Sequence, residues 1–188
     1  TAINSSMEQF IRLFEAEQRP EQLTLVRLPY KLDQLEPVMS AATVDYHYNK
    51  LSRAYVDRYN SGEGDPDFNW GGAMLHNMWW PQLQPAKGAN KPNGAIADLI
   101  DSKFGSYEEF REVFAKEAMA LQGSGWCYLS RNGDIKTLKN QDYNKSVLLP
   151  IDMWEHSYIL TKPDKQHYLK NIWRIINWEV INHRMAGQ

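Results

Sequence analysis

Two potential metal ligands stand four residues apart near the end of the chain, in the segment Asp152-Met-Trp-Glu-His156. The apolar run over 146–151 predicts a strand, and the residues after Asp152 predict a new element. A carboxylate at a strand end and an imidazole one turn into the next element can converge on one point. An oxygen and an imidazole nitrogen suit iron, manganese or zinc. Such a pair also arises by chance on surface helices, so a metal site needs further ligands.

Three of the five histidines lie in apolar or aromatic helical surroundings, namely His47, His76 and His156. A single histidine in such a place is more often a core residue than a ligand. With Asp152, however, they make a set of three nitrogens and one oxygen, which suits a redox metal that must also bind a small substrate. Many of the seven tryptophans lie near these segments, and an indole wall would exclude bulk water. The other two histidines have polar surroundings and are assigned to the surface: His167 and His183.

The composition excludes several classes of protein. The formal net charge of -2 gives no argument for binding nucleic acid or an anionic membrane. No apolar run is long enough to span a membrane, and the first residues do not resemble a signal peptide. One cysteine, Cys127, excludes an intrachain disulfide. These features indicate a cytoplasmic protein, or one of the mitochondrial matrix if a transit segment has been removed.

Helical periodicity dominates the first two thirds of the chain. Residues 3–19 predict an amphipathic helix that either packs on its own domain or docks on another chain. A helix over about 40–59 would be capped by Ser40 or Thr43. Other helices are expected over 68–83, 94–104 and 106–121, from about 155, and over about 165–185. Strands over 126–129, 135–138 and 147–151, with an Asn132-Gly133 turn between the first two, predict an antiparallel sheet.

The order of these elements, helices first and a small antiparallel sheet later, indicates an α+β fold. We expect an N-terminal helical hairpin lobe, followed by a C-terminal lobe with a three-stranded antiparallel sheet flanked by helices. The stretch 85–92, rich in proline, glycine and asparagine, is the expected lobe boundary. The predicted units are an amphipathic extension over 1–25, a helical hairpin domain over 26–90 and an α/β domain over 91–188.

From Leu28 to about Met185 the chain resembles the iron/manganese superoxide dismutases. The segments that carry the resemblance are Leu28-Pro-Tyr30, Tyr46-His-Tyr-Asn-Lys50 with Tyr55-Val56, Phe68-Asn69 leading to His76, Phe104-Gly-Ser106, Gly123-Ser-Gly-Trp126, Asn140-Gln-Asp142, Asp152-Met-Trp-Glu-His156, and Ile172-Trp173 to Asn177-Trp-Glu179. The resemblance implies that one manganese or iron ion is bound, with solvent as a fifth ligand, by His47, His76, Asp152 and His156. It also implies an antioxidant enzyme that converts superoxide to dioxygen and hydrogen peroxide, as a homodimer or a dimer of dimers.

The same resemblance assigns roles outside the ligand set. Tyr55 matches the gateway tyrosine beside the substrate channel, and Gln141 matches the glutamine that hydrogen-bonds the metal-bound solvent. Gln141 comes from a loop between strands, as in manganese-type members, and Gly72 stands where iron-type members supply that amide. Both features favour manganese. The matches to the aromatic wall are Trp80, Trp126 and Trp154, and those to residues reaching across the dimer interface are Glu155 and Tyr158.

The chain also departs from the family pattern. Leu51 stands where the family usually has a histidine that lines the proton path and bonds a tyrosine of the partner subunit. Leu75 replaces an asparagine, Tyr128 replaces a second tryptophan, and the loop over 162–167 fits poorly. These changes leave open an alternative, a catalytically weak or inactive structural subunit of a larger assembly that keeps the dismutase fold. The intact ligands and Gln141 favour the enzyme.

Overall fold

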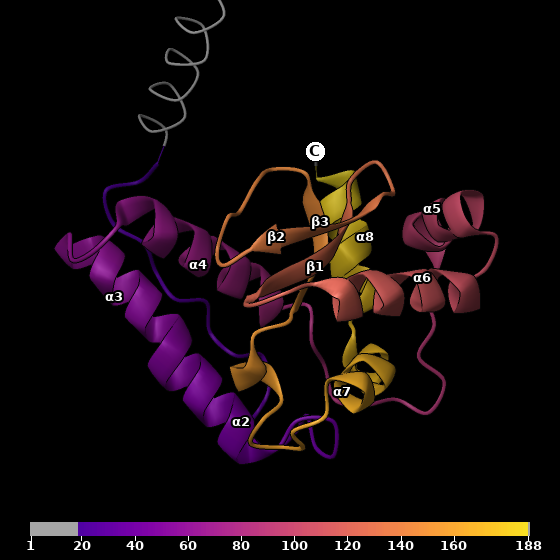
Figure 1. Ribbon diagram of the computed structural model, residues 1–188, viewed down its shortest axis with the longest axis horizontal. Helices are drawn as coiled ribbons and strands as arrows, with labels where there is room; N and C mark the ends of the chain where they lie inside the picture. The colour runs from indigo at the N-terminus through magenta and orange to yellow at the C-terminus, as the bar shows by residue number, and fades with distance from the viewer. Residues whose placement is uncertain (1–18, 188) are drawn as a thin grey trace, which may run out of the picture.

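The computed structural model describes residues 19–187, so the helix expected over 3–19 lies outside the described residues apart from Arg19. The first described helices form a long antiparallel hairpin (Figure 1). Its first arm is one continuous helix made of α2 (Ala41–Asp45), a π-helical segment (Tyr46–Ser52) and α3 (Arg53–Ser61). Ser40 is the cap, because its Oγ accepts a hydrogen bond from the backbone N–H of Thr43 at 3.1 Å.

The π-helical segment of seven residues is the part of this arm that the sequence did not predict. A π turn adds a residue to the helical repeat and so re-aims the side chains that follow it. Here Ser52 Oγ donates to the carbonyl oxygen of His47 at 2.7 Å and accepts from Trp80 Nε1 at 2.9 Å. These bonds join the segment to a residue far along the chain, so apolar periodicity alone could not reveal the π turn.

The second arm, α4 (Pro66–Trp79), occupies most of the expected range 68–83. It begins after Asp65, whose carboxylate accepts hydrogen bonds from backbone N–H groups of the first turn. A Cβ on Gly71 would lie 1.8 Å from the carbonyl oxygen of Gln141. A glycine at this position therefore allows the loop after the second strand to touch α4.

The linker expected over 85–92 has no helix or strand. After it come α5 (Gly94–Phe104), which has the predicted bounds, and α6 (Tyr107–Ala120). Ser106 caps α6, since its Oγ accepts from the backbone N–H of Glu109 at 3.1 Å. Residues on both sides of the linker, such as Trp79 and Ile96, belong to one buried core cluster. The division into units 1–25, 26–90 and 91–188 therefore stays a prediction.

The three expected strands are present as β1 (Gly125–Ser130), β2 (Ile135–Lys139) and β3 (Val147–Asp152). They form an antiparallel sheet in the order β2-β1-β3, which confirms the predicted topology class. Every residue of β3 is buried, which explains the unbroken apolar run from Val147 to Ile151. Asp152 ends β3 and pairs in register with Trp126 of β1.

Two helix predictions near the C-terminus were wrong. The helix expected from about 155 is only a three-residue 3₁₀ turn, Glu155–Ser157. The helix expected over about 165–185 is divided into α7 (Lys165–Asn171), a 3₁₀ turn (Ile172–Ile175) and α8 (Trp178–Ala186). The division occurs where backbone groups of residues 175–177 form hydrogen bonds with residues 82–84, which follow α4. Gln84 N donates to Ile175 O at 2.8 Å and Asn177 N donates to Gln82 O at 2.7 Å, so these residues leave the helical pattern.

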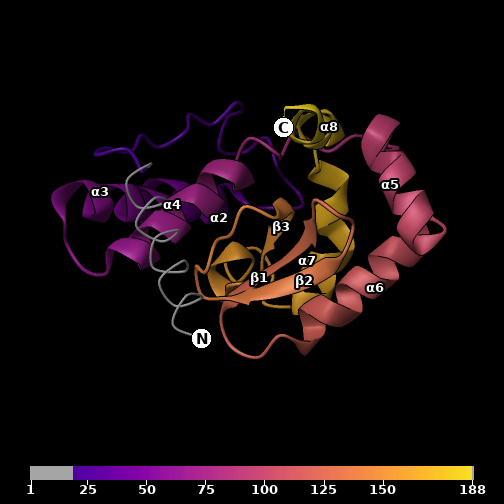
Figure 2. The same cartoon turned by 90° about the horizontal axis from the view of Figure 1, so that it is seen from above.

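Figures 1 and 2 show the sheet lying between the helical hairpin on one side and α5 and α6 on the other. α8 packs along β3, and α7 lies beside α6. This is the α+β arrangement that the sequence predicted. In residues 19–187, no helix has the length and apolar character needed to cross a membrane.

Candidate metal centre

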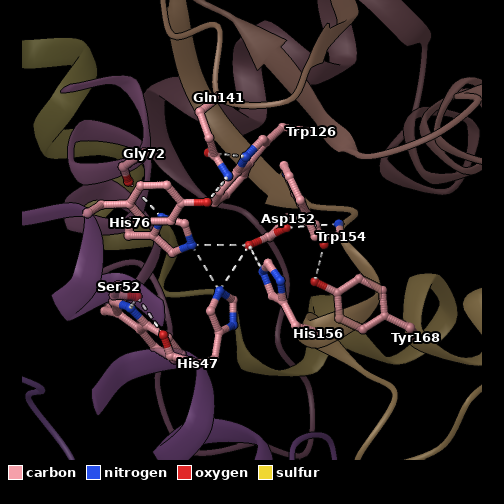
Figure 3. Close-up of polar contacts among 12 residues, drawn as sticks. His47, Ser52, Gly72, His76, Trp126, Gln141, Asp152, Trp154, His156 and Tyr168 are labelled. Carbon is pink, nitrogen blue, oxygen red and sulfur yellow. Dashed lines mark hydrogen bonds and ion pairs between the residues drawn. The ribbon is translucent and has the colours of Figure 1, made fainter. Parts of the chain in front are cut away.

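Four side chains from three distant parts of the chain point toward one another (Figure 3). His47 comes from the π-helical segment, His76 from α4, Asp152 from the end of β3 and His156 from the following 3₁₀ turn. One ligand atom of each lies within 4.8 Å of the others. The side chain of His156 is 14% exposed, whereas the other three residues are fully buried: His47, His76 and Asp152. The fold thus brings together all four ligands that the sequence predicted.

The separations between these ligand atoms fit a single ion. Oδ2 of Asp152 lies 3.0 Å from Nε2 of His47, 3.4 Å from Nε2 of His76 and 3.2 Å from Nε2 of His156. The Nε2 atoms of His47 and His76 are 3.0 Å apart. Two atoms that are each about 2.1 Å from a common ion lie about 3.0 Å apart at a right angle and about 3.6 Å apart at 120°. These four separations fall within that range.

Hydrogen bonds outside the cluster decide which atoms face it. Nδ1 of His76 lies 2.6 Å from the carbonyl oxygen of Gly72. Because a carbonyl can only accept, Nδ1 carries the proton and Nε2 presents a lone pair. Oδ1 of Asp152 accepts from the backbone N–H of Trp154 at 2.9 Å, which leaves Oδ2 for the cluster. Lone pairs this close repel one another unless a cation lies among them.

The electrostatics of the cluster favour the forms that coordinate metal. Burial lowers the pKa of His47 to about 3, outweighing its hydrogen bond with Asp152. Burial alone would raise the pKa of Asp152, but in the metal-free site the electrostatic interaction with the neighbouring His156 and hydrogen bonds with His156 and His47 hold that pKa well below its usual value. At neutral pH His47 is therefore uncharged and Asp152 is ionised, as metal ligation requires.

Each ligand histidine has an aromatic neighbour. The ring pairs and their centroid separations are Trp80 with His47 at 4.8 Å, Trp126 with His76 at 5.2 Å, Tyr55 with His76 at 5.3 Å, and Trp154 with His156 at 5.6 Å. The first two pairs meet edge to face, and the last two are stacked at 19°. These rings belong to the aromatic residues that the family resemblance predicted to surround the site. They line it with apolar surface and limit the approach of water.

Gln141 connects two of those aromatic residues (Figure 3). Its Nε2 donates to the hydroxyl of Tyr55 at 3.1 Å, and its Oε1 accepts from Trp126 Nε1 at 3.0 Å. The amide is buried, so both bonds hold it in one orientation. A Cβ on Gly72 would lie 2.3 Å from Cδ1 of Tyr55. Position 72 therefore cannot carry a side chain while Tyr55 keeps its place.

The remaining predicted residues lie apart from the ligand cluster. Glu155 is exposed, and Tyr158 is half-buried with its ring 5.1 Å from that of Tyr168. Their roles at a dimer interface stay predictions. His167 and His183 are not members of the metal-ligand cluster found among residues 19–187.

Sequence reasoning missed two residues that hydrogen-bond to predicted ligands. Ser52 bonds the carbonyl oxygen of His47, and the hydroxyl of Tyr168 donates to the carbonyl oxygen of Asp152 at 2.7 Å. Both side chains act on the backbone of a ligand rather than on a ligand atom. Such contacts join residues that are unrelated in spacing, so no sequence motif marks them.

Two family models match the chain. The alpha-hairpin domain of iron/manganese superoxide dismutases matches residues 22–66, and the C-terminal domain of the same family matches residues 92–184. A protein from Sulfolobus acidocaldarius named as an iron superoxide dismutase is 36% identical over 85% of this chain and 91% of its own length. A protein from Porphyromonas gingivalis named as a manganese/iron superoxide dismutase is 34% identical over 85% of this chain and 97% of its own length.

A third relative, named as a mitochondrial manganese superoxide dismutase of Arabidopsis thaliana, is 35% identical over 83% of this chain and 82% of its own length. With the helical hairpin, the three-stranded sheet and the cluster of three histidines and one aspartate, these matches agree on one class of protein. The chain belongs to the iron/manganese superoxide dismutase family.

Proposed function

We propose that this protein is a superoxide dismutase that uses one manganese or iron ion per chain. The observation that carries the proposal is the convergence of His47, His76, Asp152 and His156, with ligand atoms within 4.8 Å of one another. A bound manganese or iron ion supplies one-electron chemistry, by which two superoxide ions and two protons become dioxygen and hydrogen peroxide. The protein must therefore hold the ion, admit a small anion and deliver two protons.

Proton delivery is the proposed role of Tyr55 and Gln141. Burial raises the pKa of Tyr55, so the phenol stays protonated at neutral pH and can act as a hydrogen-bond donor toward the site. Gln141 holds the Tyr55 hydroxyl through a hydrogen bond of 3.1 Å, and Trp126 holds Gln141 in turn. This chain of bonds supports a catalytic role for both residues, because it fixes a proton donor beside His76.

The aromatic rings around the ligands are proposed to keep bulk water out. Trp80, Trp126 and Trp154 each contact a ligand histidine, and the first two are fully buried. In a dry site the charges of the ligands act at low dielectric, which sets the reduction potential of the ion and the acidity of nearby protons.

Manganese is the proposed preferred metal, with iron as the alternative. Support comes from the source of the amide, which is Gln141 in the loop after β2, and from Gly72, where the ring of Tyr55 excludes a side chain. Metal analysis of protein expressed with both metals supplied equally would test the preference. A preparation that contained iron alone and was fully active with it would contradict the preference.

A homodimer, or a dimer of dimers, is the proposed assembly, with Glu155 and Tyr158 at the interface. An open hollow of about 480 Å³ beside these residues also reaches ligand His156. The adjoining Ile159 and Leu160 are 45% and 53% exposed, and an apolar surface of this kind favours burial by a partner. Analytical ultracentrifugation of Glu155→Ala should show a weaker dimer, whereas Glu179→Ala on α8 should behave as the wild type. Unchanged association of Glu155→Ala would contradict this interface.

The proposed compartment is a reducing one, either the cytoplasm or the mitochondrial matrix. Support comes from the cysteine count, because a chain whose one cysteine is the free Cys127 fits a compartment in which thiols stay reduced. In either compartment the reaction would serve as an antioxidant defence.

The deciding experiment is metal analysis of the purified protein combined with an assay of superoxide decay. His76→Ala should lose both metal and activity, whereas the control His183→Ala, which changes a histidine outside the cluster, should keep both. Protein that binds one ion but leaves superoxide decay at the uncatalysed rate would refute the enzyme. Such a result would favour a structural subunit instead.

A further inference from the structure

Tyr168 is a buried residue of α7 whose hydroxyl is directed at the end of β3 (Figure 3). The hydroxyl donates a hydrogen bond of 2.7 Å to the backbone carbonyl oxygen of Asp152. The ring also packs on Tyr158, with the centroids 5.1 Å apart. Neither the ligand set nor the proposed proton path gives this tyrosine a role.

The position of Asp152 in the sheet explains why its carbonyl is available. The backbone N–H of Met153 donates to Gly125 O at 3.0 Å, so the neighbouring pair, Trp126 and Asp152, is the type that exchanges no backbone hydrogen bonds. In such a pair the carbonyl points away from the partner strand. Because β3 is at the edge of the sheet, the Asp152 carbonyl points off that edge, toward Tyr168.

We propose that Tyr168 is a positioning residue for the metal ligand Asp152. Two contacts then hold this residue: Trp154 N–H binds Oδ1 of the side chain, and the Tyr168 hydroxyl binds the backbone carbonyl. Together they hold the backbone carbonyl and the side-chain Oδ1 of Asp152, and they leave Oδ2 directed at the histidines. The inference rests on the proposed function only in requiring that a metal ion binds at this cluster.

Tyr168→Phe tests the inference because it keeps the ring and its packing but removes the hydroxyl. Loss of a group that orients a metal ligand typically weakens metal binding by about 10-fold to 100-fold. We expect a loss of that size in the affinity for Mn²⁺, measured by competition with a chelator, and an altered electron paramagnetic resonance spectrum of the bound ion.

Tyr107→Phe is the matched control. The hydroxyl of Tyr107 is also buried, but it has no hydrogen-bond partner among the described residues. Its removal should change the Mn²⁺ affinity by less than about twofold, the scatter expected where no ligand contact is lost. Circular dichroism would verify that both variants fold, and affinities would be measured well below both melting temperatures.

A purely structural role would lower the melting temperature of Tyr168→Phe but leave the affinity and the spectrum of the bound ion as in the wild type. That result would overturn the inference. A crystal structure of the metal-loaded wild type provides a second test, independent of any variant. A separation above about 3.5 Å between the Tyr168 hydroxyl and the Asp152 carbonyl would also overturn it. Wild-type protein that binds Mn²⁺ but does not consume superoxide would refute the proposed function and leave this inference standing.

Discussion

Gly72→Ala should destabilise the protein, although alanine normally favours a helix over glycine by about 1 kcal/mol. The new Cβ would lie 2.3 Å from Cδ1 and 2.6 Å from Cε1 of Tyr55. That ring is held by its stack on His76 and by the hydrogen bond from Gln141, so it cannot move freely. Overpacking of this kind costs about 1–3 kcal/mol, and loss of the bond to the buried amide adds about 1–3 kcal/mol. After subtracting the helical gain, the net loss is about 1–5 kcal/mol.

Urea unfolding of the metal-free protein is the suitable assay, because a bound ion would add its own binding energy to the measured stability. The same substitution should be repeated in a Tyr55→Ala background, where the obstructing ring is gone. There Gly72→Ala should be neutral or should stabilise by up to about 1 kcal/mol. Gly88→Ala is the control, since a Cβ at that position would have no neighbour within 4 Å. Equal costs in the two backgrounds, or no cost in the wild-type background, would refute the reasoning.

Three further predictions concern turnover and pH. Gln141→Ala should keep the metal but slow superoxide consumption, because the hydroxyl of Tyr55 and the indole N–H of Trp126 lose their partner; unchanged rates with full metal occupancy would contradict the role of the amide. Leu51→His should raise the maximal rate at unchanged metal content, because a titratable side chain would add a proton donor, and stopped-flow kinetics that show no gain would identify Leu51 as a packing residue. In the metal-free protein, the free energy of unfolding should fall as the pH drops from about 6.5, the usual pKa of histidine, towards the folded pKa of His47 at about 3, because only the unfolded chain binds that proton. Asp152, whose pKa is depressed in the fold, should extend the loss of stability below about pH 3.9, its pKa in the unfolded chain. Urea unfolding of His47→Gln at several pH values should show a flatter dependence of the unfolding free energy on pH between about 6.5 and about 3. A slope equal to that of the wild type would be evidence against assigning this pH dependence to His47.

Local sequence patterns were sufficient for the elements whose signals are local. The cap at Ser40, one of two residues that the pattern allowed, lies next to the helix it starts, and the bounds of α5 were predicted to the residue. The apolar runs of β1 and β3 were also sufficient, because strands buried in the core need continuous apolar sequence.

The metal ligands could be named from the sequence for a different reason. Asp152 and His156 stand four residues apart, and His47 and His76 stand out as polar residues in apolar or aromatic helical segments. Their grouping came from residue type and apolar surroundings, and the resemblance to a family then implied that they bind one ion; spacing alone cannot bring His47 and His76 to Asp152.

Only the tertiary structure decided how the ligands are aimed. The π-helical segment around His47, the bond from Tyr168 to Asp152 and the contact of Gly71 with Gln141 each join segments far apart in the chain. The break in the predicted C-terminal helix has the same origin, because Ile175 and Asn177 exchange helical bonds for bonds to the segment after α4. Residue types and local periodicity set which elements form, but the partners of backbone polar groups are chosen when those elements pack.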